Sequence, residues 1–155
     1  MKKALILLVF IVLGLSSSYA QKLEQVDGLY YKKGMLYSGT HTEYFPNGQL
    51  SMELNIHNGR EHGKMELYFE SGINKEHREY NNGKKTGTWV IWAENGTKLA
   101  EASYTDDVKN GAWYVWSDKG IMLFEMHYTN GNKTGTWRQW DENGNLLSEH
   151  DYPEQ

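Results

Sequence analysis

The sequence predicts an all-β protein, an elongated and twisted single sheet formed as an antiparallel meander of tandem β-hairpins. Three observations support this prediction. Glycines recur every 24 residues in two columns, aromatic residues recur at the same interval, and two turn signals fall within each interval. The segments between turns are rich in aromatic and β-branched residues, which favour strands. Equal spacing in several columns indicates internal duplication, and so one small unit is repeated along the chain.

A secretory signal peptide is predicted for residues 1–20. Lys2 and Lys3 form a basic start, an apolar run follows, and small residues precede a cleavage point after Ala20. The apolar run is shorter than the roughly 20 residues that span a membrane, which disfavours the alternative of an uncleaved anchor. The mature protein is therefore expected to be exported, either periplasmic or secreted.

Composition excludes several classes of function. The signal peptide holds two of the 16 Lys and Arg residues and none of the 20 Asp and Glu residues, which leaves 14 basic residues and a net charge of −6. This charge argues against nucleic-acid binding, which needs clustered cations, and against docking on anionic membranes. The chain has no cysteine, so disulfides and thiolate zinc sites are excluded, and packing of the aromatic residues must hold the fold.

The repeat divides the chain into a cap and five units. The cap is a degenerate half-unit, residues 21–38, as expected at the end of a repeat array. The units of 24 residues, the last slightly clipped, are 39–62, 63–86, 87–110, 111–134 and 135–155. The glycine columns are Gly39, Gly63, Gly87, Gly111 and Gly135, and Gly48, Gly72, Gly96, Gly120 and Gly144.

Each unit contains two turn signals. One is Asn-Gly, beginning at Asn58, Asn82 and Asn130 and replaced by Asp106-Asp107 in the third unit. Asn-Gly supplies the positive φ that a two-residue hairpin turn requires. The other signal ends at the second glycine column. The strands between these turns give about two strands per unit.

The register follows if Asn95-Gly96 is also treated as a two-residue turn. Trp89 then lies opposite Ala102 and Trp92 opposite Leu99. The next unit places Trp113 opposite Met126, Val115 opposite Phe124 and Trp116 opposite Leu123, and the Asn130-Gly131 turn places Phe124 opposite Trp137. A longer loop would shift these partners.

Side chains alternate between the faces of a strand, which separates an apolar face from a mixed one. The apolar face, predicted to be the core, collects Trp113, Val115, Met122, Phe124, Met126 and Tyr128. The mixed face collects Tyr114, Trp116, Leu123 and Glu125, and it sets Arg138 opposite Glu149 as a cross-strand ion pair. A single sheet cannot bury both faces, so it must either bend until the aromatic columns close on one another or leave one aromatic stripe for a partner.

The predicted partner-binding surface combines an aromatic column and an acidic column on the mixed face. Trp and Tyr dominate the energetics of protein interfaces. The same rings are also open to two other interpretations, packing within the core and stacking on the sugar faces of a glycan. The surface comprises Tyr44, Tyr68, Trp92, Trp116, Trp140, Glu101, Glu125 and Glu149.

The sequence does not predict an enzyme, a cofactor or a metal site. None of the six histidines forms a close metal-ligand pair. The glutamate column places one carboxylate in each unit except the second, which has His77, and neighbours in the column are roughly 10 Å apart by strand spacing. Such a regular ladder is typical of structure rather than of acid–base catalysis. Nucleophile-elbow, P-loop and dinucleotide-binding motifs are missing from the sequence.

The strings G-T-W-V-I-W-A-E-N-G-T-K-L-A-E-A-S-Y (87–104), G-A-W-Y-V-W-S-D-K-G-I-M-L-F-E-M-H-Y (111–128) and G-T-W-R-Q-W-D-E-N-G-N-L-L-S-E-H-D-Y (135–152) resemble the MORN-repeat variant. That variant occurs in bacterial proteins often labelled as toxin–antitoxin system antitoxins of the YwqK family. The resemblance covers residues 39–152. It implies an elongated, twisted antiparallel sheet used for protein association or, in some proteins, for lipid contact.

Three functions follow from these observations. The leading hypothesis is an exported, non-enzymatic scaffold that binds another protein through its aromatic and acidic face. The alternatives are a cell-envelope binder of glycan or lipid, and an antitoxin or immunity-type protein that neutralises a toxin. An open meander also leaves edge strands, through which two copies can dimerise edge to edge.

Overall fold

The computed structural model describes residues 23–154, so the predicted signal peptide lies outside the described residues. Thirteen strands form within this range. The part of the chain that the structure describes has no helix long and apolar enough to cross a membrane.

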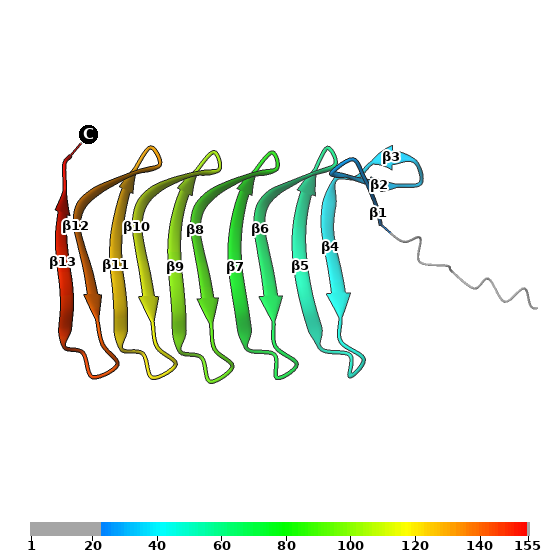
Figure 1. The fold of residues 1–155 in the computed structure, drawn as a ribbon. Helices are drawn as coiled ribbons and strands as arrows, with labels where there is room; N and C mark the ends of the chain where they lie inside the picture. The colour runs from blue at the N-terminus through cyan, green and yellow to red at the C-terminus, as the bar shows by residue number, and fades with distance from the viewer. Residues whose placement is uncertain (1–22, 155) are drawn as a thin grey trace, which may run out of the picture.

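Ten strands form one antiparallel sheet in which every strand pairs with the next in the sequence, as Figure 1 shows. This arrangement confirms the predicted meander with two strands per unit. The strands are β4 (Gly39–Tyr44), β5 (Leu50–His57), β6 (Arg60–Tyr68), β7 (Asn74–Asn81), β8 (Lys84–Trp92), β9 (Lys98–Thr105), β10 (Val108–Trp116), β11 (Met122–Thr129), β12 (Asn132–Trp140) and β13 (Leu146–Tyr152).

The Asn-Gly turns have the predicted two-residue geometry. Asn82 has φ of 50° and Gly83 has φ of 82°, and Asp106 and Asp107 adopt φ of 48° and 71° in the third unit. Two successive residues with positive φ define a turn whose twist matches that of the flanking strands. Each of these turns also bonds to the preceding unit, since the Gly83 amide donates to the carbonyl of Glu61 at 2.8 Å.

The hairpins at the opposite end of the strands have five-residue loops, and here the predicted two-residue turn is wrong. In the third unit the Ala93 amide donates to the Thr97 carbonyl at 2.8 Å, and the Gly96 amide donates to the Ala93 carbonyl at 2.9 Å. The same pair of bonds recurs in every unit. The loop closes through these two bonds, so the turn starts before Asn95 and ends after Gly96.

The longer loop shifts the register by one residue at the end of each hairpin. Trp92 pairs with Lys98 instead of Leu99, although the predicted pairing of Trp89 with Ala102 is confirmed. Trp116 likewise pairs with Met122 rather than Leu123, while Trp113 opposite Met126 and Val115 opposite Phe124 are confirmed. A bulge next to the loop therefore accommodates one extra residue on the returning strand.

A second irregularity lies at the first glycine column. Phe124 pairs with Gln139 instead of the predicted Trp137, because the register between β11 and β12 shifts between Glu125 and His127. Gly135, with φ of 62°, lies within the bulged segment of β12. The shift amounts to two residues, so it changes partners without moving side chains to the opposite face.

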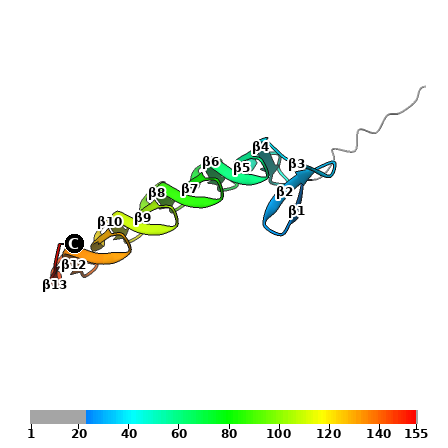
Figure 2. The same ribbon diagram turned by 90° about the horizontal axis from the view of Figure 1, so that it is seen from above.

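The sheet is elongated and its strands are curved. Strands β6, β8, β10 and β12 bend near their starts, where the first glycine column lies. Seen along the strands, the sheet extends as a narrow stepped ribbon (Figure 2). The bend and the bulges give each unit the same shape, so that identical positions of successive units lie in rows.

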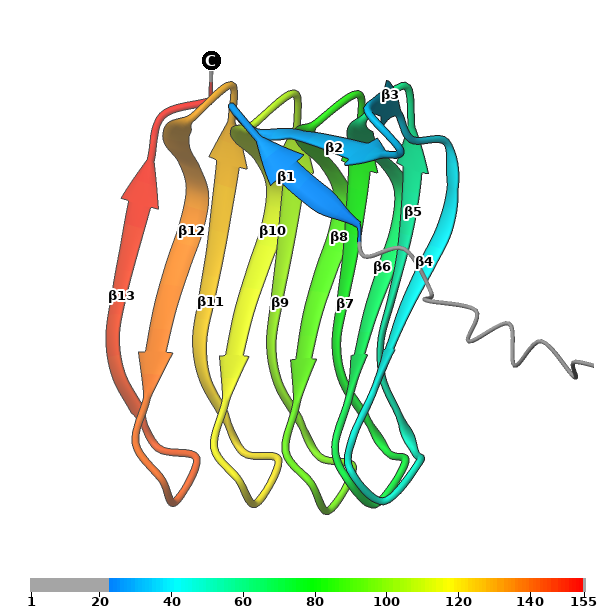
Figure 3. The same cartoon turned by 90° about the vertical axis from the view of Figure 1, so that its right-hand side faces the viewer.

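A separate three-stranded sheet precedes the meander. It consists of β1 (Glu24–Val26), β2 (Leu29–Lys32) and β3 (Met35–Leu36), and it lies beside the upper end of β4 and β5 (Figure 3). The Tyr30 amide donates to the Gly59 carbonyl at 2.8 Å, and the Gly59 amide donates to the Tyr37 carbonyl at 2.8 Å. The small sheet is thus docked on the first Asn-Gly turn.

The docking of this small sheet is expected to weaken above pH 10. Burial, followed by the charge of Glu61, raises the pKa of Tyr30 to about 12, and the phenol donates to Glu61 Oε1 at 3.2 Å. A raised pKa means that the folded state favours the neutral phenol, so this stability is fully present below pH 10 and is lost as the pH rises to 12. Tyrosinate absorbance and amide exchange of β2 should report the loss.

Tyr30→Phe is the control for this prediction, because it removes the titrating hydroxyl and keeps the ring. Protection of the β2 amides in this variant should fall less between pH 10 and pH 12 than in the unaltered protein. An equal fall in both proteins would assign the effect to other tyrosines.

Very few side chains are fully covered. Among the described residues the buried apolar side chains are Leu54, Ile56 and Val90. Most other strand residues are half-buried. A single-layer sheet has no second layer to cover either face, so its stability depends on contacts between side chains of neighbouring strands.

Candidate interaction surface

The two faces of the ten-stranded sheet carry different chemistry. We call the face that holds Trp89 and Ala102 the ladder face, and the opposite face, which holds Val90 and Glu101, the carboxylate face. Adjacent residues of one strand point to opposite faces, so these cross-strand pairs fix the assignment. The ladder face corresponds to the predicted core face and the carboxylate face to the predicted mixed face.

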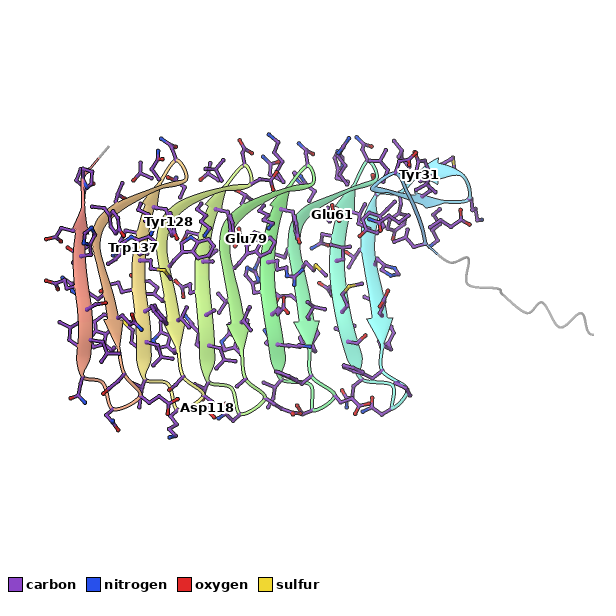
Figure 4. The ribbon with its side chains drawn as sticks, viewed as in Figure 1. Tyr31, Glu61, Glu79, Asp118, Tyr128 and Trp137 are labelled. Carbon is purple, nitrogen blue, oxygen red and sulfur yellow. The ribbon has the colours of Figure 1, made fainter. Side chains whose placement is uncertain are left out.

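Seven rings form a continuous aromatic ladder along the ladder face. Tyrosines and tryptophans alternate, and neighbouring ring centroids are 5.1 to 5.4 Å apart. Tyr128 of β11 and Trp137 of β12 are one such pair (Figure 4). Tilted and edge-on contacts at this distance are favourable for aromatic rings. In order the rings are Tyr80, Trp89, Tyr104, Trp113, Tyr128, Trp137 and Tyr152.

Polar groups fix the rings of the ladder in place. The indole of Trp113 donates from Nε1 to the Ser103 carbonyl at 3.0 Å, and Trp89 and Trp137 make the equivalent bonds. Lys109 Nζ lies 4.2 Å from the Trp113 ring centroid, a cation–π contact that recurs at Lys85 and Lys133. The ladder rings are therefore occupied by internal contacts, which supports a structural role for them.

The eight residues of the predicted partner-binding surface all lie on the carboxylate face. Lys98 connects the acidic column with the aromatic column, since its Nζ lies 2.6 Å from Glu101 and 5.6 Å from the Trp116 ring centroid. The rings of Tyr114 and Trp116 are 5.6 Å apart. Burial, then the charges of Glu66 and Glu53, raise the pKa of Tyr68.

Exposure differs along the aromatic column of this face. Tyr44 is 63% exposed, whereas Tyr68, Trp92, Trp116 and Trp140 are half-buried. Unlike the ladder, this column shows no ring-to-ring contact between successive members within residues 23–154. Its members lie two strands apart, about 10 Å by strand spacing. The column is therefore a row of separated rings.

Arg138 links two members of the acidic column. Its Nε lies 2.7 Å from Glu149 Oε2 and its Nη1 lies 3.1 Å from Glu125 Oε2. The pairing of Arg138 with Glu149 confirms the sequence prediction. Hydrogen bonds to Glu149 and Glu125 raise the pKa of Arg138. One cation serves two carboxylates here, so Arg138 does not fully neutralise the charge of Glu125 and Glu149.

A polar cluster that the sequence analysis missed lies at the N-terminal end of the carboxylate face. His77 lies 2.7 Å from Glu66 and 3.2 Å from Glu79, and Glu53 pairs across the strands with Glu66. Glu66 Oε2 is buried and has no hydrogen-bond partner in the described structure. The signal in the sequence is His77 itself, which replaces glutamate in the acidic column.

The described residues contain no group of three or more His, Asp or Glu side chains placed to hold a metal ion. The cluster at His77 extends along the sheet surface and does not converge on one point.

Comparison with known proteins identifies the repeat in two segments. A family described as MORN repeat variant matches residues 37–58 and 133–152. The first segment contains the first hairpin of the large sheet, β4 and β5, and the second covers the last hairpin, β12 and β13, except for Asn132. No curated protein matches the chain.

Proposed function

We propose that the protein is an exported, non-enzymatic repeat scaffold that binds another protein through its carboxylate face. The row of separated rings from Tyr44 to Trp140, beside carboxylates that are only partly neutralised, is the observation that supports this function. Partly exposed Trp and Tyr side chains provide binding energy, and flanking charges select the partner. MORN repeats commonly bind proteins or membranes, and the two matched segments agree with a scaffold of this kind.

The expected partner has a basic contact surface. Within the described residues four glutamates of the acidic column and Glu66 lie along one line across the sheet. The four are Glu53, Glu101, Glu125 and Glu149. Lys98 and Arg138 oppose this charge at two points. A basic surface would be attracted over the whole length of the face and would bind faster at low ionic strength.

Replacing Trp92, Trp116 and Trp140 together by alanine is expected to abolish partner capture and preserve the fold. Partners are first identified by affinity purification from the native host followed by mass spectrometry. The variant should then retain less than about a tenth of the bound partner, since such rings are typical hot-spot residues. The far-ultraviolet circular dichroism of the sheet should stay the same.

The same experiment separates this proposal from its alternatives. Loss of the sheet signal would show that these tryptophans maintain the fold, and unchanged capture would place the binding site elsewhere. Retention on peptidoglycan, polysaccharide or liposomes, without a captured protein, would favour the envelope binder. The antitoxin label is supported by family resemblance alone, and co-purification of a cognate toxin would be its supporting result.

A further inference from the structure

A groove on the ladder face arises from two alanines in the middle of the sheet. Ala100 and Ala102 of β9 occupy positions where the other returning strands carry larger side chains. Both alanines are on the ladder face, because Ala102 pairs with Trp89 and with Trp113 on the two sides. The corresponding pairs are Met52 and Leu54 in β5, Glu76 and Arg78 in β7, Phe124 and Met126 in β11, and Ser148 and His150 in β13.

The groove has a small floor and large walls. Its volume is about 300 Å³, with Ala100 and Ala102 in its lining. Ile91 pairs with Ala100 on one side and Val115 pairs with it on the other. The wall residue Ile91 is 42% exposed. Because the side chains next to the alanines are Trp, Ile and Val, the groove is lined mainly by apolar atoms, as expected of a site that takes an apolar group.

The rim of the groove carries more positive than negative charge. Arg78 lies 5.2 Å from the Trp89 ring centroid and pairs with Glu76. Lys85 lies 5.3 Å from the ring centroid of Tyr104, which also lines the groove, and Lys109 lies 4.2 Å from that of Trp113. The charged residues that line the groove are Arg78, Glu76 and Glu101, and each of these carboxylates has an ion-pair partner, Arg78 for Glu76 and Lys98 for Glu101. Lys85 and Lys109 lie beside the groove against two of its lining rings and form no salt bridge within residues 23–154, so the net charge around the groove is positive. This sign is the opposite of that of the carboxylate face.

We propose that this groove binds one bulky apolar side chain of an acidic segment of a partner protein. The floor and walls accept an aromatic or long aliphatic group, and Lys85 and Lys109 attract carboxylates next to it. The groove volume lies at the lower end of the range for ligand sites, which fits a single large side chain. Strand β9 is internal, so its backbone is already paired and recognition must occur through side chains.

Packing gives this proposal independent support. Filling the groove with the residues that the next unit carries, Phe124 and Met126, would add apolar contacts at positions of matching register. The third unit lacks these contacts although its neighbour shows that the repeat accommodates them. Natural proteins often give up local stability where a binding site requires open space.

The test uses a short peptide with one phenylalanine flanked by glutamates, titrated into the isotopically labelled protein. We expect saturable shifts of the indole N–H resonances of Trp89 and Trp113, which line the groove and donate within the structure. Replacing the phenylalanine of the peptide by alanine should abolish the shifts. Replacing its glutamates by lysines should weaken binding by about tenfold, because the rim is basic.

Two protein variants test the location. Ala100→Phe with Ala102→Met fills the groove with side chains that the fourth unit already accommodates, and should weaken binding at least about tenfold. Ile91→Glu places a carboxylate on an exposed wall and should have a similar effect, while Ile91→Lys, its matched control, should retain binding.

Unchanged titration curves in the filled and Ile91→Glu variants would overturn the proposal. A preference for the lysine-flanked peptide would do the same. Shifts produced by phosphatidylglycerol vesicles but not by the acidic peptide would assign the groove to a lipid instead. The tryptophans of the carboxylate face are unaltered in these variants, so their outcome is independent of the function proposed for that face.

Discussion

Trp113→Ala is expected to lower the free energy of unfolding by about 3 kcal/mol. The ring contacts Tyr104 and Tyr128 at centroid distances of 5.2 and 5.4 Å. Its indole also donates to the Ser103 carbonyl, which would lose this donor. Truncation removes apolar contact and aromatic pairing on both sides at once. Chemical denaturation followed by circular dichroism measures the change.

The size of the loss should depend on where the tryptophan lies in the array of units. Trp137→Ala removes equivalent contacts close to the C-terminal end, so only the last hairpin should lose stability, as expected for nearest-neighbour coupling in a repeat. Trp116→Ala, on the same strand but on the carboxylate face, should cost roughly 1 kcal/mol because one ring contact is lost. Equal losses for Trp113 and Trp116 would contradict the special role of the ladder.

Gly111→Ala is expected to destabilise the protein by about 2 to 3 kcal/mol, because both conformation and space oppose a side chain there. Gly111 has φ of 107°, a conformation that L side chains rarely adopt, and a Cβ at this position would lie 3.0 Å from Ser103 Cβ. Ser103 belongs to the neighbouring strand, so relief requires β9 and β10 to separate slightly. Thermal unfolding of the purified variant tests this expectation.

Gly96→Ala is the matched control, since Gly96 also has a positive φ, 83°, but a Cβ there meets open space within 4 Å in the described structure. Its cost should be about 1 kcal/mol, the conformational part alone. If Gly111→Ala costs no more than Gly96→Ala, the close approach of Ser103 is unimportant. The glycine of the first column would then be required for its backbone conformation only.

Spacing in the sequence was sufficient to predict the meander, the two-residue turns and the division into faces. These features depend on the positive φ that Asn-Gly favours and on the alternation of side chains along a strand. Both can be read directly from the sequence. The five-residue loops were not predicted, because the sequence at Asn95-Gly96 resembles that of the two-residue turns. The bulge that displaces Trp137 from Phe124 was also missed, since Gly135 alone does not reveal a change in pairing.

The candidate surfaces could be predicted to different extents. The carboxylate face follows from parity, and the two-residue error in register did not change which residues share that face. The sequence does not show which aromatic column is engaged in internal contacts; the distances between the ladder rings identify it. The groove at Ala100 and Ala102 could be recognised only from the cross-strand pairs. A small side chain leaves a groove only where the residues beside it on both neighbouring strands are large.

The hydrogen bonds of each Asn-Gly turn join a unit only to the unit before it, so units can be added to the sequence without changing how the others pack. A unit meets only the units before and after it, so an added copy of residues 111–134 would meet the same neighbours as the existing one. Each copy would lengthen the sheet by two strands, about 9.5 Å. The length of the sheet is therefore set by the number of units, and gene duplication can change it while every existing unit keeps its fold.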